Sequence, residues 1–122
     1  MLLKIKKIIS KKNKTKIICL TAYSKNIASI LDNYCDIILV GDSLGSVLYS
    51  YSTTREVTLN TMIEHSKSVR KGIKKSLMVV DMPYNTYKNP KEALSDSSTS
   101  LDFLQFEELV IGTNKVLDMD NE

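Results

Sequence analysis

The segment Asp36-Ile37-Ile38-Leu39-Val40-Gly41-Asp42-Ser43-Leu44-Gly45 (DIILVGDSLG) runs from an apolar stretch directly into an aspartate flanked by glycines. A similar ending recurs at residues 77–83 (LMVVDMP), where Asp81 follows four apolar residues. Short aliphatic runs of this kind are typical of strands that are buried on both faces. We therefore predict buried strands at residues 36–40 and 77–80, each followed closely by a carboxylate.

The segments around these two strands alternate between strand and helix patterns. Residues 16–20 (KIICL) predict a further short strand, and apolar residues at helical spacing predict helices at 24–34 and 59–73. Ser24 could cap the first helix, and Thr58 or Thr61 the second, with Glu64 completing a capping box. This alternation predicts repeated βα units around a parallel sheet.

The remaining segments give weaker patterns. Residues 2–9 predict a short amphipathic helix, and the lysine-rich residues 11–16 predict a solvated linker. Residues 46–57 are rich in Ser, Thr and Tyr and predict a loop. Residues 90–94 resemble the start of a fourth helix, whereas residues 101–111 fit a helix or a strand equally well.

Length and composition predict one globular domain. The chain has 122 residues, 43% hydrophobic and 25% charged, with a net charge of +3. Residues 1–94 hold sixteen basic and seven acidic residues, whereas residues 95–122 hold one basic and seven acidic. We therefore predict a change of character at residue 94, with an acidic tail at 95–122.

The sequence predicts a cytoplasmic protein with reduced thiols. Cys19 and Cys35 lie in or beside apolar sequence without the paired spacing of a zinc site, so we expect buried, unpaired thiols. No run approaches the roughly 20 apolar residues of a membrane span. The lysines near the amino terminus lack interleaved aromatic residues, which favours a solvated face over nucleic-acid binding.

The two carboxylates predict a metal site. In parallel α/β folds the loops after the strands build the site, so Asp42 and Asp81 are expected to converge there on a divalent cation such as Mg²⁺. The alternative is that each aspartate caps a helix or turn. The repeated pattern of an aliphatic run followed by an aspartate favours the metal site.

Four segments resemble one known family in order and spacing: LTAY, DIILVGDSLG, VTLNTMIEHSKSVRKG and VVDMPYNTY. Over residues 16 to about 94, the chain is similar to ketopantoate hydroxymethyltransferases. The resemblance implies a (β/α)₈ TIM barrel of the phosphoenolpyruvate/pyruvate type, with about three βα units here after an amino-terminal helix. It also implies a homo-oligomer for the full-length family.

The resemblance implies a reaction and a set of site residues. The family transfers a one-carbon unit from 5,10-methylenetetrahydrofolate to 3-methyl-2-oxobutanoate, which gives 2-dehydropantoate for pantothenate synthesis. Asp42 and Asp81 are implied to hold Mg²⁺, which would chelate the 2-oxo acid. Ser43 is implied to bind the oxo acid's carboxylate, and Tyr23 to line its site. The partners implied are therefore a small 2-oxo acid and a folate.

Other polar residues fit structural roles better. His65 is the single histidine and lies at the margin of its helix's apolar stripe, so a structural role is favoured over a general base. The basic residues after it fit a solvated face better than a pterin or phosphate site. These residues are Arg70, Lys71, Lys74 and Lys75.

Part of the family's sequence pattern has no counterpart here. The segment resembling KLEGG and the later glutamate that acts as general base are missing, and residues 95–122 show no resemblance. We therefore expect no catalytic base in this chain, and a truncated, frame-shifted or recombined gene with little turnover. The alternatives are another Mg-dependent 2-oxo-acid lyase of the same superfamily and a non-catalytic binding or assembly module.

Overall fold

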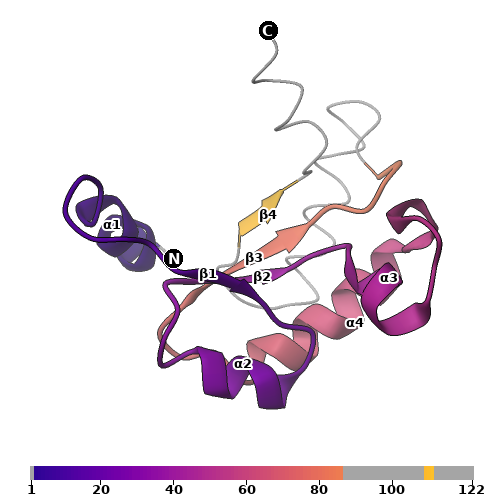
Figure 1. Cartoon of the computed structure of the whole chain (residues 1–122), viewed down its shortest axis with the longest axis horizontal. Coiled ribbons are helices and arrows are strands. Elements are labelled where there is room, and N and C mark those ends of the chain that lie inside the picture. Colours follow the sequence, from indigo (N-terminus) through magenta and orange to yellow (C-terminus); the bar gives the residue numbers. More distant parts are fainter. Residues whose placement is uncertain (1, 87–108, 112–122) are drawn as a thin grey trace, which may run out of the picture.

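The computed structural model describes residues 2–86 and 109–111. Its centre is a parallel sheet of four strands in the order β1-β2-β3-β4 (Figure 1). The strands are β1 (Cys19–Thr21), β2 (Ile37–Val40), β3 (Leu77–Asp81) and β4 (Leu109–Ile111). The three predicted strands and their parallel arrangement are thus confirmed. The fourth strand lies in the segment for which the sequence left helix and strand open.

The register of the sheet brings the ends of β2 and β3 level. Ile37 pairs with Leu77, and Val40 pairs with Val80. Every residue of β3 is buried, as expected for a strand covered on both faces. The edge strand β1 differs, because all three of its residues are exposed. The prediction that Cys19 is buried is therefore wrong, whereas Cys35 is buried; both thiols are unpaired in the structure.

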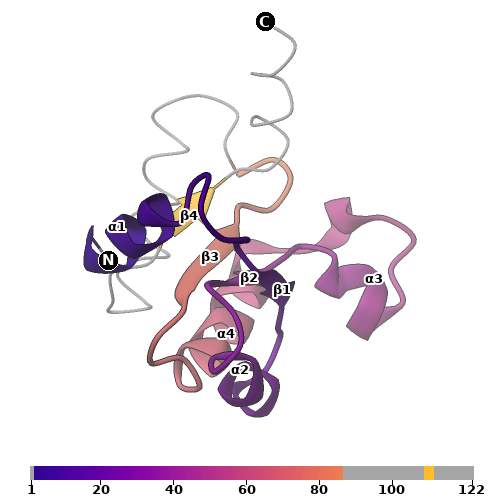
Figure 2. The same ribbon diagram turned by 60° about the vertical axis from the view of Figure 1, so that its left-hand side comes forward.

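Two helices lie side by side on one side of the sheet, α2 (Lys25–Leu31) and α4 (Leu59–Arg70) (Figures 1 and 2). The apolar stripe of α4 faces the core, as its spacing predicts, with Met62 and Val69 almost fully buried. Together with the sheet these helices enclose one apolar core. Its main members are Ala22, Ala28, Ile38, Val40, Leu44, Val57, Met62, Val69, Ile73, Met78 and Val80.

The helix α1 (Leu2–Ser10) lies at the amino-terminal ends of the strands (Figure 1). Lys4 Nζ donates to Ser76 O at 2.9 Å, immediately before β3, and Lys11 forms an ion pair with Asp36, immediately before β2. Polar contacts of α1 thus reach the start of two strands. None of the helices that the structure describes is long and apolar enough to cross a bilayer.

The predicted loop at residues 46–57 is partly wrong. It contains most of a helix, α3 (Leu44–Tyr49), and a 3₁₀ turn, η1 (Thr54–Glu56). Only Leu44 and Gly45 of α3 are buried, so its side chains show no apolar stripe that a sequence pattern could reveal. A Cβ on Gly45 would lie 2.5 Å from Val57 Cγ2, which explains why this close approach needs glycine.

The caps of the helices follow the sequence only in part. Thr58 caps α4, and its hydroxyl accepts from Thr61 N–H at 3.2 Å. Glu64 pairs with Lys67 at 3.2 Å, so the predicted capping box at Thr61 is not formed. The hydroxyl of Ser24 makes no capping hydrogen bond to α2.

Gly72 is where the turn after α4 crosses the backbone of α2. A Cβ there would lie 2.5 Å from Lys25 O and 2.8 Å from Ser29 N, both backbone atoms that cannot turn aside. We expect Gly72→Ala to lower the free energy of unfolding by about 1–3 kcal/mol, since overpacking forces backbone shifts. Urea denaturation measures this change, with the exposed neighbour Lys71→Ala as control. Equal stability of the two variants would contradict the close approach.

Candidate functional site

Asp42 and Asp81 meet at the carboxyl ends of β2 and β3. Asp81 is the last residue of β3, and Asp42 follows β2 after a single glycine. The backbone N–H of Asp42 donates to Asp81 Oδ2 at 3.0 Å. A Cβ on Gly41 would approach that same oxygen to 3.5 Å and Ser43 Oγ to 3.2 Å. The two carboxylates predicted to share one end of the sheet therefore lie together there.

Asp81 is held in an environment that disfavours its negative charge. The residue is only 4% exposed, and its Oδ1 is buried without a hydrogen-bond partner among the described residues. Burial raises the pKa of Asp81 to about 6; the hydrogen bond from Asp42 N–H opposes this rise, and the charge of Asp42 adds to it. Burial also raises the pKa of Asp42. Two neighbouring carboxylates are thus poorly solvated.

Ser43 and Tyr23 lie beside the carboxylates. Tyr23, just after β1, places its hydroxyl 2.8 Å from Ser43 Oγ. Ser43 is the N-cap residue of α3, but its side chain makes no capping hydrogen bond. The hydroxyl of Ser43 therefore contacts Tyr23 and does not cap the helix, which was the alternative role for this residue. All four residues predicted for the site come from the carboxyl ends of three neighbouring strands.

His65 connects the exit of β1 with α3. Its Nδ1 lies 2.9 Å from Tyr23 O, and its Nε2 lies 2.7 Å from the hydroxyl of Tyr49. Because a carbonyl oxygen only accepts, Nδ1 carries a proton that it donates to Tyr23 O, and Nε2 is hydrogen-bonded to the hydroxyl of Tyr49. Both ring nitrogens are therefore engaged in bonds that position other groups, which fits the structural role expected for His65.

Sequence reasoning missed Tyr49. It lies sixteen residues before its partner His65, in the segment predicted as a loop, so no local pattern indicates the contact. The basic residues after His65 lie away from the carboxylates: Arg70 Nη1 donates to Ile73 O at 2.9 Å, and Lys71, Lys74 and Lys75 are exposed.

The carboxylate pair suits a hard divalent cation. An ion such as Mg²⁺ prefers oxygen ligands and would satisfy the buried Asp81 Oδ1 while offsetting the repulsion from Asp42. In the part of the chain that the structure describes, no group of three or more His, Cys, Asp or Glu side chains could hold a metal. Two protein carboxylates plus substrate oxygens and water would be an ordinary ligand set for Mg²⁺.

Comparisons with known proteins agree on one family. The profile of the ketopantoate hydroxymethyltransferase family matches residues 3–108, so the match continues past residue 94. A 3-methyl-2-oxobutanoate hydroxymethyltransferase from Pelagibacter ubique is 69% identical over 109 residues, covering 85% of this chain and 42% of that protein. The enzymes of that name from Chelativorans sp. and Anaplasma marginale (strain Florida) are 48% and 50% identical. These alignments cover 71% and 83% of this chain, and 31% and 36% of those proteins.

The matched region covers more than half of this chain but less than half of each of these relatives. Asp42 and Asp81 come from two of the segments that resemble this family, DIILVGDSLG and VVDMPYNTY. The structure places these segments on neighbouring parallel strands and brings the two aspartates together. The chain belongs to the ketopantoate hydroxymethyltransferase family, a family of one-carbon transferases.

Proposed function

We propose that this chain forms the metal-binding and oxo-acid-binding part of a 3-methyl-2-oxobutanoate hydroxymethyltransferase, which acts in pantothenate synthesis. The observation that carries this proposal is the buried, unpartnered Oδ1 of Asp81, next to a second carboxylate at the end of a parallel sheet. The four parallel strands would be part of a (β/α)₈ barrel, in which sites lie at this end. The substrate is proposed from the relatives, which are named 3-methyl-2-oxobutanoate hydroxymethyltransferases.

In this proposal Asp42 and Asp81 hold Mg²⁺. When bound, the ion would draw electron density from the keto group of the oxo acid and so acidify its C3 proton. Ionised carboxylates are the form that binds a cation, so the cation would also lower the pKa of Asp81 from its raised value.

The hydroxyls of Ser43 and Tyr23 would orient the oxo acid. Tyr23 can donate its proton to Ser43 Oγ, which leaves the proton of Ser43 free to donate to the substrate carboxylate. Gly41 keeps the space beside Ser43 Oγ open, because a Cβ there would lie 3.2 Å from that oxygen. Binding and orientation are thus the roles that we assign to these residues.

No described residue is assigned the removal of the C3 proton. Both nitrogens of His65 are bonded to Tyr23 and Tyr49, and the hydrogen-bonded Asp81 is placed at the cation. The one-carbon donor, 5,10-methylenetetrahydrofolate, is likewise proposed from the family and not from a site described here.

The test is the Mg²⁺-dependent binding of 3-methyl-2-oxobutanoate to the 122-residue chain, followed by calorimetry. We expect binding with Mg²⁺ and none with EDTA. Tyr23→Phe should weaken oxo-acid binding about threefold to tenfold, the usual effect of one neutral hydrogen bond, and leave Mg²⁺ affinity unchanged. Tyr34→Phe, at a residue 72% exposed after α2, is the control. Oxo-acid binding that does not require a divalent cation would contradict the proposal.

A further inference from the structure

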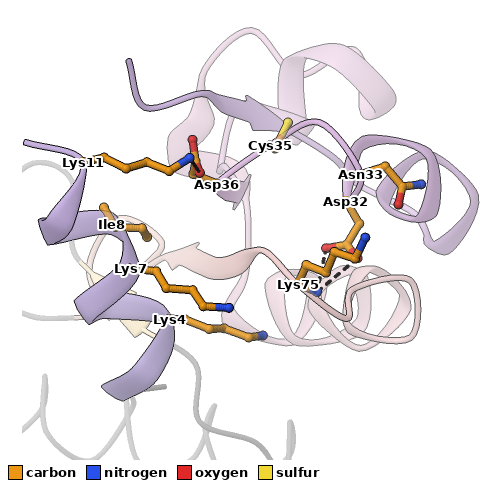
Figure 3. Close-up of a pocket in the computed structure, with 9 residues that line it drawn as sticks. All are labelled: Lys4, Lys7, Ile8, Lys11, Asp32, Asn33, Cys35, Asp36 and Lys75. Atoms are coloured by element: carbon orange, nitrogen blue, oxygen red, sulfur yellow. Dashed lines mark hydrogen bonds and ion pairs between the residues drawn. The ribbon is translucent and has the colours of Figure 1, made fainter. Parts of the chain in front are cut away.

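A hollow lies at the amino-terminal ends of the strands, at the opposite end of the sheet from the carboxylate pair. Two cavities of about 250 and 430 Å³ share Asp32, Asn33 and Lys75 as lining residues. We call them together the basal groove. Figure 3 shows the first cavity, with Lys4, Lys7 and Lys11 on one side and Lys75 on the other. The second cavity continues between α2 and the turn after α4, where Gly72 lies.

Positive charge dominates the basal groove. Seven lysines line it, against two aspartates among the described lining residues. Asp36 is already paired with Lys11 and accepts from Ile18 N–H at 2.9 Å. Asp32 accepts hydrogen bonds from the backbone N–H groups of residues 74–76. Both carboxylates are therefore used within the fold.

Several lysines of the groove keep their charge available to a ligand. No ion-pair partner is found within the described residues for the ammonium groups of Lys7, Lys25, Lys71, Lys74 and Lys75. Like charges gathered around a hollow repel one another, and an anion placed between them removes that repulsion. Asn33 and Ser29 add neutral polar groups to the same lining.

The lining indicates a small anion more than a nucleic acid. Among the described lining residues neither cavity contains an aromatic side chain, so the bases of a single strand would find no surface for stacking. Lysines bind phosphate groups as point charges. Lys75 lines both cavities, and further lysines line each of them. We propose that the basal groove binds a small anion with two or more phosphate groups. This site is independent of the function proposed for the carboxylate pair.

Titration of the 122-residue chain with pyrophosphate at low salt tests this proposal. We expect saturable binding of pyrophosphate, stronger than that of inorganic phosphate. Lys74→Gln/Lys75→Gln should weaken pyrophosphate binding about tenfold or more, and Lys7→Gln, on the opposite wall, should weaken it less. The matched control is Lys12→Gln/Lys14→Gln, which removes two exposed lysines that line neither cavity.

Three results would overturn the proposal. One is the absence of saturable pyrophosphate binding to the unmodified chain. Another is an equal loss in the groove variant and in the Lys12/Lys14 control, which would indicate diffuse attraction to a basic surface. The third is tight binding of a single-stranded oligonucleotide that pyrophosphate does not displace, which would indicate a nucleic-acid surface instead.

Discussion

Replacing Asp32 by alanine is expected to lower the free energy of unfolding by about 2–4 kcal/mol, because one buried and two partly buried backbone donors lose a charged acceptor. Asp32 is 6% exposed and follows α2. Its carboxylate accepts from the backbone N–H groups of Lys74 (2.9 Å), Lys75 (3.1 Å) and Ser76 (2.8 Å). These bonds tie the end of α2 to the turn that leads into β3.

The pH dependence of this effect has a definite sign. Burial raises the pKa of Asp32, but the hydrogen bonds from Ser76, Lys74 and Lys75 outweigh that effect and hold the pKa below its ordinary value. A depressed pKa stabilises the fold above the unfolded-state pKa of about 4, and this stabilisation is lost as the pH falls through the folded-state pKa. The difference in the free energy of unfolding between the unmodified chain and Asp32→Ala should therefore be largest at pH 7 and decrease in acid.

Urea denaturation at pH 7 and at pH 3 measures both expectations. The control is Asn33→Ala, at the exposed neighbouring residue, which should change stability by less than about 0.5 kcal/mol, as is usual at surface positions. A loss below about 1 kcal/mol for Asp32→Ala at pH 7 would mean that the three N–H groups find other partners, since unsatisfied buried donors cost more than this.

Asp81→Asn is expected to make the metal-free chain more stable at pH 7.5. Because the pKa of Asp81 is raised to about 6, the carboxyl group of Asp81 stays protonated in the folded chain between pH 4 and 6, whereas it ionises in the unfolded chain. Stability must then fall as the pH rises through this window, by up to roughly 3 kcal/mol for two pKa units. Asparagine stays neutral and avoids this loss.

Denaturation in EDTA at pH 4.5 and 7.5 tests the expectation. The two chains should be close in stability at pH 4.5, and Asp81→Asn should be more stable at pH 7.5. Glu64→Gln, which removes a carboxylate that is 61% exposed, should show no such change with pH. A stability difference between the chain and Asp81→Asn that is the same at both pH values would show that Asp81 is ionised without penalty.

The strands could be predicted from sequence because their evidence is local. The aliphatic runs before Asp42 and Asp81 indicate buried strands, and the parallel order then places both carboxylates at one end of the sheet. The apolar stripe of α4 likewise follows from residues three and four positions apart. These features need no knowledge of distant segments.

The features that the sequence did not reveal have two causes: partners far away in the chain, and burial that local sequence patterns do not indicate. Asp32 is hydrogen-bonded to residues more than forty positions later in the chain. His65 is hydrogen-bonded to Tyr23, 42 positions earlier, and to Tyr49, 16 positions earlier. The helix α3 buries only its first two residues, so its apolar side chains have no helical pattern. The exposure of Cys19 follows from the position of β1 at the edge of the sheet, which its apolar sequence does not indicate.

Binding of a divalent cation by the carboxylate pair is the central claim, and a titration with Mn²⁺ tests it most directly. Mn²⁺ takes the same oxygen ligands as Mg²⁺, and the signal of the free ion in electron paramagnetic resonance reports how much is bound. We predict one Mn²⁺ bound per chain, displaced by excess Mg²⁺. Glu64→Gln should retain this binding, and Asp81→Asn should lose it. Equal Mn²⁺ binding by the unmodified chain and Asp81→Asn, or none by the unmodified chain, would contradict the assignment of Asp42 and Asp81 as the metal site.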